Sequence, residues 1–496
     1  MIYKKILIKV VCTLIMILGA SWWSFAQRDS ITIEMALDIA EENNPSLRTS
    51  KLNLERSQLN LLAQKLALKS RFTLNLEPAS YSRERRFENR LSEWYENETF
   101  STGGTFRVSQ PILLTDGTIT LTDNFSWQNN TSFTEGNTRQ NKAFNNNLRL
   151  TLDQPIFTYN TRKMALKDLE FRYENAGISY ALQRLRTEAS ISDQFYRVYM
   201  AQNTLEIRKE EFENEKKNYE IIKSKVDASL LPRAELFQAE VNFLSAQSAV
   251  EDQIASLENA KDNLKLALGI PLNENINVKA DIEFTTVPVN FNQAVESGMA
   301  SRMELRQREI EIEQADMDMV QTKAQNEFRG NISLSLGITG VDERFSNMYN
   351  NPTQNPRVAV SFSVPIFDWG EKKARVKAQE TTQTIAKLNA ENQINEIELN
   401  VRQVFREIER IHTQIGIEEK NLQNAQRTYD LNVIKYREGE LTGMQMSQYQ
   451  TQLSTRKISY SQTLINYKIA LLNLKIASLY DFENDKPVIP VMGLEN

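Results

Sequence analysis

Apolar residues recur at helical spacing over long stretches of the chain. Between Ile394 and Tyr429 they return every three or four positions and then every seven, as in coiled coils. No proline interrupts the segment from about Asp368 to Glu438, which predicts one helix of roughly 69 residues, about 100 Å long. Asp368 followed by Glu371 resembles a capping box at its start. A second seamed helix follows after a short turn, so the two are predicted to form a long antiparallel hairpin.

Other segments alternate with a period of two, which is typical of strands. Apolar side chains occupy every second position over 332–338 and again over 358–366, on either side of a polar loop at 342–357. Strands of this kind build a sheet with one apolar and one polar face. The preceding segment, 301–328, has a helical pattern.

An internal repeat relates the two halves of the chain. Gln-Pro-Ile-Phe at 154–157 recurs as Val-Pro-Ile-Phe at 364–367, and this offset of 210 residues continues without a gap through the following helices. The starts of the copies are offset by 258 residues instead, as Leu47 and Leu305 illustrate. Copy one therefore carries 48 additional residues within about 77–147.

The additional residues have their own alternation. Apolar positions alternate from Phe106 to Leu114 and from Ile119 to Trp127, and Asp116-Gly117 between them is a hairpin turn signal. The segment could add two strands to the sheet of each subunit, or it could form an extracellular hairpin.

The first 26 residues have the pattern of a secretory signal peptide. Lys4 and Lys5 precede a short apolar stretch that ends at Ser24-Phe25-Ala26, a small-x-small cleavage pattern. The stretch is short for a membrane-spanning helix, which needs about 20 apolar residues. Cys12 is the only cysteine, so the mature chain is predicted to have no thiol, disulfide or cysteine-ligated metal.

The expected organisation has four parts. They are the signal peptide (1–26), repeat one (27–280), repeat two (281–480) and a C-terminal tail (481–496). Loss of the signal peptide with its three lysines would change the formal net charge from -5 to about -8.

Composition and motifs argue against several classes of function. A mildly acidic chain without a basic stripe does not suit nucleic acid. The single histidine, His412, falls inside the predicted coiled coil, and no Ser/His/Asp arrangement accompanies it. The sequence contains no phosphate-binding glycine loop and no zinc or metalloprotease pattern. We therefore expect neither an enzyme nor a metal or cofactor site.

Three features together resemble the TolC-like outer-membrane factor family, also called outer membrane efflux proteins. They are the opening segment at 36–47 (Ala-Leu-Asp-Ile-Ala-Glu-Glu-Asn-Asn-Pro-Ser-Leu), the doubled plan, and the Pro-Ile-Phe strand ends that lead into long helices. The resemblance covers nearly the whole mature chain. It implies a mixed, mainly α fold with two repeats of coiled-coil hairpins, whose strands contribute to a trimeric outer-membrane β-barrel above a periplasmic α-helical tunnel.

The resemblance also implies a function. The family forms the exit duct of tripartite efflux pumps or type I secretion systems, in the outer membrane of Gram-negative bacteria and extending into the periplasm. Expected partners are two further copies of the chain, outer-membrane lipid, a periplasmic adaptor (membrane fusion protein) and an inner-membrane transporter. A periplasmic adaptor or a coiled-coil scaffold is the alternative, since both can contain long hairpins.

Two groups of candidate residues follow from the family. Adaptor contact at the hairpin tips is carried over to Ser229, Leu230, Leu231, Gly439, Glu440 and Leu441. Acidic residues that line a closed entrance in some relatives correspond here to Glu235, Gln238, Gln445 and Gln448. Only one of these four is acidic, so a strongly cation-binding constriction is not expected. A solvated turn and a helix-start acid are the plain structural alternatives for the two groups.

Overall fold

The computed structural model describes residues 30–89, 93–134, 137–280 and 285–494. The predicted signal peptide lies outside the described residues. Two compact units are present: the first comprises Met1–Leu52, Gly177–Leu305 and Asn392–Asn496, and the second comprises Asn53–Ala176 and Arg306–Glu391.

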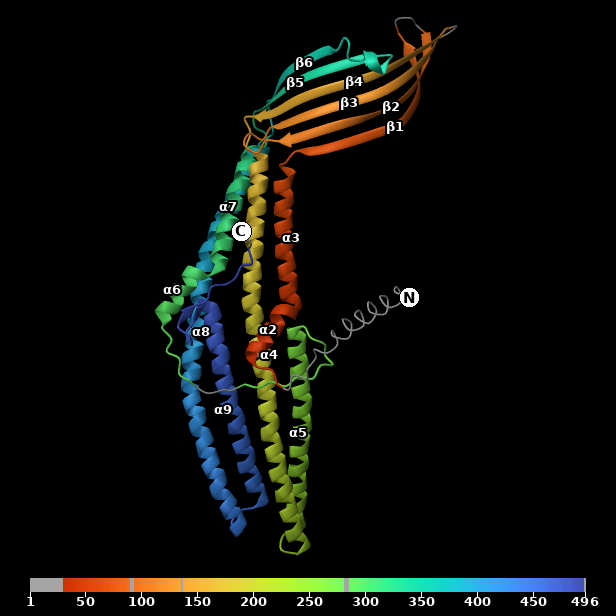
Figure 1. The fold of residues 1–496 in the computed structure, drawn as a ribbon. Helices are drawn as coiled ribbons and strands as arrows, with labels where there is room; N and C mark the ends of the chain where they lie inside the picture. The colour runs from red at the N-terminus through yellow and green to blue at the C-terminus, as the bar shows by residue number, and fades with distance from the viewer. Residues whose placement is uncertain (1–29, 90–92, 135–136, 281–284, 495–496) are drawn as a thin grey trace, which may run out of the picture. The chain divides into compact units, whose positions relative to one another are not determined.

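The elements follow one another in the order helices, strands, long helices, and then the same again (Figure 1). The helices are α2 (Ile33–Asn43), α3 (Pro45–Ala67), α4 (Thr161–Asp227), α5 (Arg233–Leu268), α6 (Phe291–Ser301), α7 (Met303–Lys323), α8 (Glu371–Glu438) and α9 (Gly443–Ser478), with the short 3-10 helix η1 (Phe345–Asn347). The strands are β1 (Arg71–Glu88), β2 (Glu93–Pro111), β3 (Thr118–Thr134), β4 (Asn137–Ile156), β5 (Arg329–Asp342), β6 (Thr353–Ser363), β7 (Tyr480–Asp481) and β8 (Lys486–Pro487).

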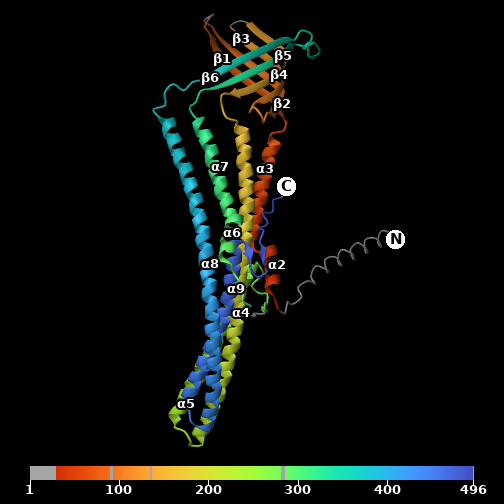
Figure 2. The same ribbon diagram turned by 90° about the vertical axis from the view of Figure 1, so that its left-hand side faces the viewer.

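The mixed, mainly α fold and the long helices predicted from the seams are confirmed. Helix α8 ends at Glu438, as expected, and α4 and α5, like α8 and α9, are joined by short turns (Figure 1 and Figure 2). None of the helices within the described ranges combines the length and the apolar character that crossing a membrane requires.

Two predicted boundaries need correction. Strand β6 ends at Ser363 and does not continue to Ile366, because its partner β5 begins at Arg329, which pairs with Ser363. Helix α8 begins at Glu371, and Asp368 caps it from outside: its carboxylate accepts hydrogen bonds from the backbone N–H groups of Gly370 (3.0 Å) and Lys372 (3.1 Å). These bonds lower the pKa of Asp368.

Six strands form one antiparallel sheet in the second unit, in the order β1-β2-β3-β4-β5-β6. Strands β2 and β3 lie in the segment that the sequence identified as additional. They pair with each other and with β1 and β4 in continuous ladders, so they are part of this sheet and do not form a separate hairpin. Of the two alternatives that the sequence left open, the segment therefore adds two strands to the sheet.

The sheet has one apolar and one polar face, as the alternation predicts. Many cross-strand pairs on the apolar face join large aliphatic or aromatic groups, for example Leu121↔Leu150, Leu150↔Leu336 and Leu334↔Val358. Toward the far ends of β3 and β4 the same face carries polar pairs such as Asn129↔Lys142. Partners on the other face are mainly Ser, Thr, Asn and Arg. Many apolar side chains of the first face are exposed in the single chain: Phe72, Leu74, Leu76, Leu148, Leu150, Leu334, Leu336, Val358, Val360 and Phe362.

A polar pair among the apolar side chains of this face is covered by a loop. Asn146, which is buried, donates a hydrogen bond of 2.7 Å to the carboxylate of Asp123 on the neighbouring strand. The β5–β6 loop folds onto this position: Phe345 packs edge-on against Phe125, and Met348 lies against Gly340, the ladder partner of Asn146. The loop thus keeps a buried polar pair away from the surface of the sheet.

Corresponding contacts recur in the first unit. Helix α2 packs on α5, and α6 packs on α9, through small residues such as Ala36 and Ala294, both fully buried. Asn44, at the end of α2, donates to the carbonyl of Ala267, and Arg302, at the end of α6, donates to that of Ala477. These pairs obey the two offsets of the repeat. The repeat boundaries themselves stay a prediction.

The turn between β2 and β3 caps helix α4. Asp116, which adopts a positive φ of 62°, accepts hydrogen bonds from the backbone N–H groups of Thr161 (3.1 Å) and Arg162 (3.3 Å). The Arg162 guanidinium returns to the turn and donates to the carbonyl oxygens of Asp116 and Gly117, both at 2.6 Å. This cap stabilises the N-terminus of a long helix, where the helix dipole is positive, and fixes the turn of the β2–β3 hairpin beside it.

Replacing Asp116 with Ala should loosen the start of α4. Loss of an N-cap costs about 1 kcal/mol, so amide hydrogen exchange over 161–164 should accelerate about fivefold. Asp153→Ala, on the neighbouring strand β4, is the matched control and should leave these amides unchanged. Equal exchange in wild type and Asp116→Ala would contradict the assigned cap.

Candidate functional site

Both hairpin tips use the same backbone motif. After α4, the N–H of Leu230 donates to the carbonyl of Lys225 (2.7 Å), and the N–H of Ser229 donates to that of Val226 (2.9 Å). After α8, the N–H groups of Glu440 and Gly439 make the equivalent bonds, at 3.0 and 3.2 Å. Each tip is thus a Schellman motif, which needs one residue in the left-handed region.

Ser229 and Gly439 are the residues in that region, with φ of 58° and 86°. Glycine adopts this conformation freely, whereas serine meets steric strain of about 1–2 kcal/mol. The hydrogen bonds of the motif hold Ser229 in place, so the two tips share one backbone geometry although only the second has glycine.

The tip residues differ in exposure. Leu230 is 72% exposed, and Ser229, Gly439 and Glu440 are also exposed. Leu231 and Leu441 are half-buried, so they serve partly to close the turns. Leu230 is therefore the most exposed apolar side chain of the two tips.

The four entrance candidates lie in different environments. Glu235 is half-buried in the first turn of α5, and Gln238 donates to Asn242 one turn further along (3.1 Å). Gln445 completes a capping box with Thr442, the N-cap of α9, so it has a structural role.

Gln448 faces a groove of about 620 Å³ between α5 and α9. The residues that line it are Asn242, Met444, Ser447, Gln448, Thr451, Gln452, Thr455 and Arg456. Amides and hydroxyls dominate, and no carboxylate is among them. The groove brings Gln448 near Asn242, the partner of Gln238, and suits polar contacts better than cation binding.

A row of polar contacts joins the two hairpins close to their tips. Helix α4 supplies Glu211, which accepts from Thr451 (3.1 Å), and Asn214, which donates to Gln450 (3.1 Å). Nearer the tips, Tyr436 of α8 donates to Asn218. We call Glu211, Asn214, Glu215 and Asn218 of α4, together with their contacts on α8 and α9, the polar row. The polar row was not predicted from the sequence, although Glu211, Glu215 and Asn218 repeat at helical spacing beside the apolar seam.

Glu215 is the unusual member of the polar row. It is only 4% exposed; its carboxyl group interacts with Ser447 and Asn218, while Oε2 has no hydrogen-bond partner among the described residues. Burial raises the pKa of this carboxyl, with a further contribution from the charge of Glu211. A buried, partly unsatisfied carboxylate is destabilising when it is ionised.

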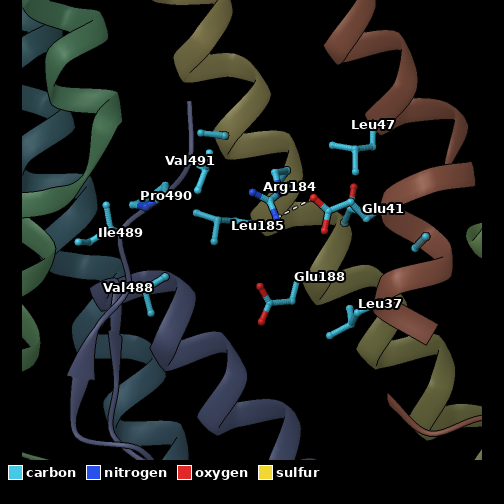
Figure 3. A pocket seen from close by; sticks show the side chains of 13 residues that line it. Leu37, Glu41, Leu47, Arg184, Leu185, Glu188, Val488, Ile489, Pro490 and Val491 are labelled. Carbon is cyan, nitrogen blue, oxygen red and sulfur yellow. Dashed lines mark ion pairs between the residues drawn. The ribbon is translucent and has the colours of Figure 1, made fainter. Parts of the chain in front are cut away.

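A second concavity lies higher in the first unit. Figure 3 shows this cavity of about 330 Å³, with Leu37 and Leu47 on one side and the segment from Val488 to Val491 on the other. Arg184 and Glu41 form an ion pair across it at 2.9 Å. Both groups are substantially exposed, so the pair is worth less than about 1 kcal/mol. The lining is mostly aliphatic and offers no catalytic arrangement.

Within the residues that the structure describes, no group of three or more His, Cys, Asp or Glu side chains is placed to hold an ion.

Comparison with known proteins identifies the family. The sequence pattern of the family "Outer membrane efflux protein" matches residues 118–270 and 294–478, which is more than half of the chain. The protein belongs to this family. The two matched segments fall in the two predicted copies, and the first begins at β3.

Individual relatives of the efflux proteins are distant in sequence but alike in fold. A probable outer membrane lipoprotein of Salmonella typhimurium, SilC, is 20% identical over 285 residues, which are 55% of this chain and only 60% of SilC. The CmeC outer membrane channel of Campylobacter jejuni superposes with a TM-score of 0.68 at 16% identity, over 95% of this chain and 91% of CmeC. The open-state MtrE outer membrane channel of Neisseria gonorrhoeae gives 0.64 at 14% identity, over 90% and 88%.

Glu215→Gln should remove a pH dependence of stability. Because the folded pKa is raised, folded protein holds this proton more tightly, so stability falls as pH rises from the ordinary carboxyl range through the raised pKa. Thermal unfolding between pH 5 and 9 should show the variant about 1 kcal/mol more stable than wild type at pH 8, and nearly equal at pH 5.

The titratable groups that face Glu215 are Glu211 on α4 and Tyr429 and Tyr436 on α8. All three are kept in both proteins, so the comparison isolates one carboxyl. Glu213→Gln, at an exposed position on the same helix, is the control and should follow wild type. A variant that follows the wild-type pH profile would refute the assignment.

Proposed function

We propose that this protein is the outer-membrane exit duct of a tripartite efflux pump or type I secretion system. The observation that carries the proposal is the six-stranded sheet, which exposes an apolar face and keeps a polar one, in a chain whose helices form two long hairpins. An exposed apolar face of this size has no place in water, and lipid covers it without further protein. The polar face then lines an aqueous passage.

A homotrimer completes the duct. A single sheet leaves the outer edges of β1 and β6 unpaired, and a closed barrel is the arrangement that removes them. The membership in the efflux protein family supports three copies, with a shared barrel in the outer membrane of a Gram-negative bacterium and the hairpins arranged as a tunnel in the periplasm. No cofactor is needed for this function, since the chain would provide only a passage.

The remaining partners are a periplasmic adaptor and an inner-membrane transporter. We assign adaptor contact to the tips, because Leu230 is exposed there on a hydrogen-bonded turn and Glu440 provides a charge beside Gly439. The entrance would be lined by amides and one acid, Glu235, so the duct would not discriminate strongly by cargo charge. Selection of cargo would fall to the transporter.

Cell fractionation combined with crosslinking in mild detergent tests the duct. The protein should be recovered with the outer membrane, and lysine crosslinking should give a species near three times the subunit mass. The β-sheet should also make migration on a gel depend on heating. A soluble periplasmic monomer would refute the proposal and favour a scaffold.

Substitution of Leu230 by Asp tests the assignment of the tip. Loss of a central apolar contact typically costs more than 1 kcal/mol, so export should fall at least fivefold, measured as sensitivity to compounds against which the wild-type protein protects. Outer-membrane amount and trimer yield should stay the same.

Leu272→Asp is the matched control, since Leu272 is similarly exposed (58%) in the loop after α5. Equal export by both variants would show that the first tip is only a solvated turn.

A further inference from the structure

The sheet contains more strands than a simple doubling of the chain would give. Repeat two contributes β5 and β6, whereas repeat one contributes β1 to β4. Two strands from each repeat would make four per chain; the chain has six in one sheet. The extra pair, β2 and β3, lies inside the strand order and not at an edge. A barrel built from this sheet therefore has to include both strands.

The ladders show that β2 and β3 are paired within the sheet over nearly their whole length. The pairing between them runs without a register shift from Glu96↔Phe133 to Pro111↔Thr118, and β3 pairs with β4 in the same uninterrupted way. Their apolar side chains continue the apolar face, as in Val108↔Leu121. The hydrogen bonds of Asp116 hold the turn between β2 and β3 against the start of α4.

The two free edges are complementary to each other. Strands alternate in direction across the sheet, so β6 of one copy would meet β1 of another in antiparallel orientation. Each edge has three exposed apolar residues at alternate positions, followed by a proline. They are Phe72, Leu74, Leu76 and Pro78 on β1, and Phe362, Val360, Val358 and Pro356 on β6.

An antiparallel alignment of Leu74 with Val360 brings all of these residues into register. The apolar residues then lie on one face, and Pro78 lies opposite Pro356. Neither proline has an N–H to leave unpaired. The register shift between Glu77 and Ser80 occurs at the same level of β1, so the pairing has a natural end there.

We propose that β1 of one copy pairs with β6 of the next, and that three copies close an eighteen-stranded pore. The inference rests on the trimer of the proposed function and adds the number of strands and the order of the edges. With strands 4.8 Å apart and tilted by about 40°, eighteen strands span about 36 Å between opposite backbones, against about 24 Å for twelve. The additional segment of repeat one is thus a device that widens the outer-membrane passage by half.

Paired cysteines test which edges meet. The double variant Leu74→Cys/Val360→Cys should give disulfide-linked dimers and trimers on oxidation. The native Cys12 would not interfere, because it lies in the predicted signal peptide. Leu121→Cys/Val360→Cys is the matched control, because Leu121 lies two strands further inside the sheet on the same face. It should give none.

The reverse result would overturn the inference. If Leu121→Cys crosslinks to Val360→Cys in the trimer and Leu74→Cys does not, β3 meets β6 of the next copy and the pore has twelve strands. Lysine crosslinking of the same samples separates this outcome from failure of the proposed function, in which no trimer forms at all.

Channel conductance provides an independent measure of the width. Deletion of 90–135 removes β2 and β3 and joins Asn89 to Gly136, an Asn-Gly pair that favours a two-residue hairpin turn. Strands β1 and β4 then pair with their apolar residues still on one face. Because cross-section scales with the square of strand number, conductance in planar bilayers should fall to about half or less. Unchanged conductance of the assembled variant would contradict an eighteen-stranded pore.

Discussion

The rest of the structure depends on the one-sided sheet. A sheet with exposed apolar side chains gathered on one face from β1 to β6 cannot be stable alone in water, because this face stays uncovered and the outer edges of β1 and β6 stay unpaired. Lipid can cover the face, and further copies of the chain can satisfy the edges. Even a polar pair among these apolar side chains follows this rule, because the Asp123–Asn146 pair is covered by Phe345 and Met348 of the chain's own β5–β6 loop.

The helices have a different balance of interactions. Each hairpin has an apolar seam, but contact between the hairpins near their tips also uses the polar residues Glu211, Asn214, Glu215 and Asn218. They lie beside buried Ile222, which packs against Gly443 of α9. Polar contacts of this kind are weaker and more specific than apolar ones, and each depends on geometry and protonation.

Periodic features could be predicted from the sequence, and contacts between distant residues could not. The seam from Ile394 to Tyr429 and the alternation at 332–338 located α8 and β5, since burial of one face imposes those periods. The Asp116 cap joins residues 45 positions apart, and nothing in the turn signal Asp-Gly shows which helix it meets. The polar row repeats at helical spacing too, but only the fold reveals that its surroundings are buried.

The tips illustrate the same limit on a smaller scale. Glycine, as at 439, is the residue expected in the left-handed region, whereas serine, as at 229, is not, although the two positions have the same hydrogen bonds. The repeat offset of 210 residues was the better guide, because it equates the two turns whatever residue stands there. Whether β2 and β3 joined the sheet depended on pairing with β1 and β4, which alternation alone does not specify.

Which face of the sheet meets lipid is the most direct question for this account. Single cysteines along β5 of the membrane-embedded protein can be labelled with a lipid-soluble and with a membrane-impermeant reagent. We expect the lipid-soluble reagent to react with cysteine at 332, 334 and 336, and the water-soluble one to react at 333 and 335. Equal labelling by the water-soluble reagent at all five positions would contradict the account, since no face of the sheet would then lie against lipid.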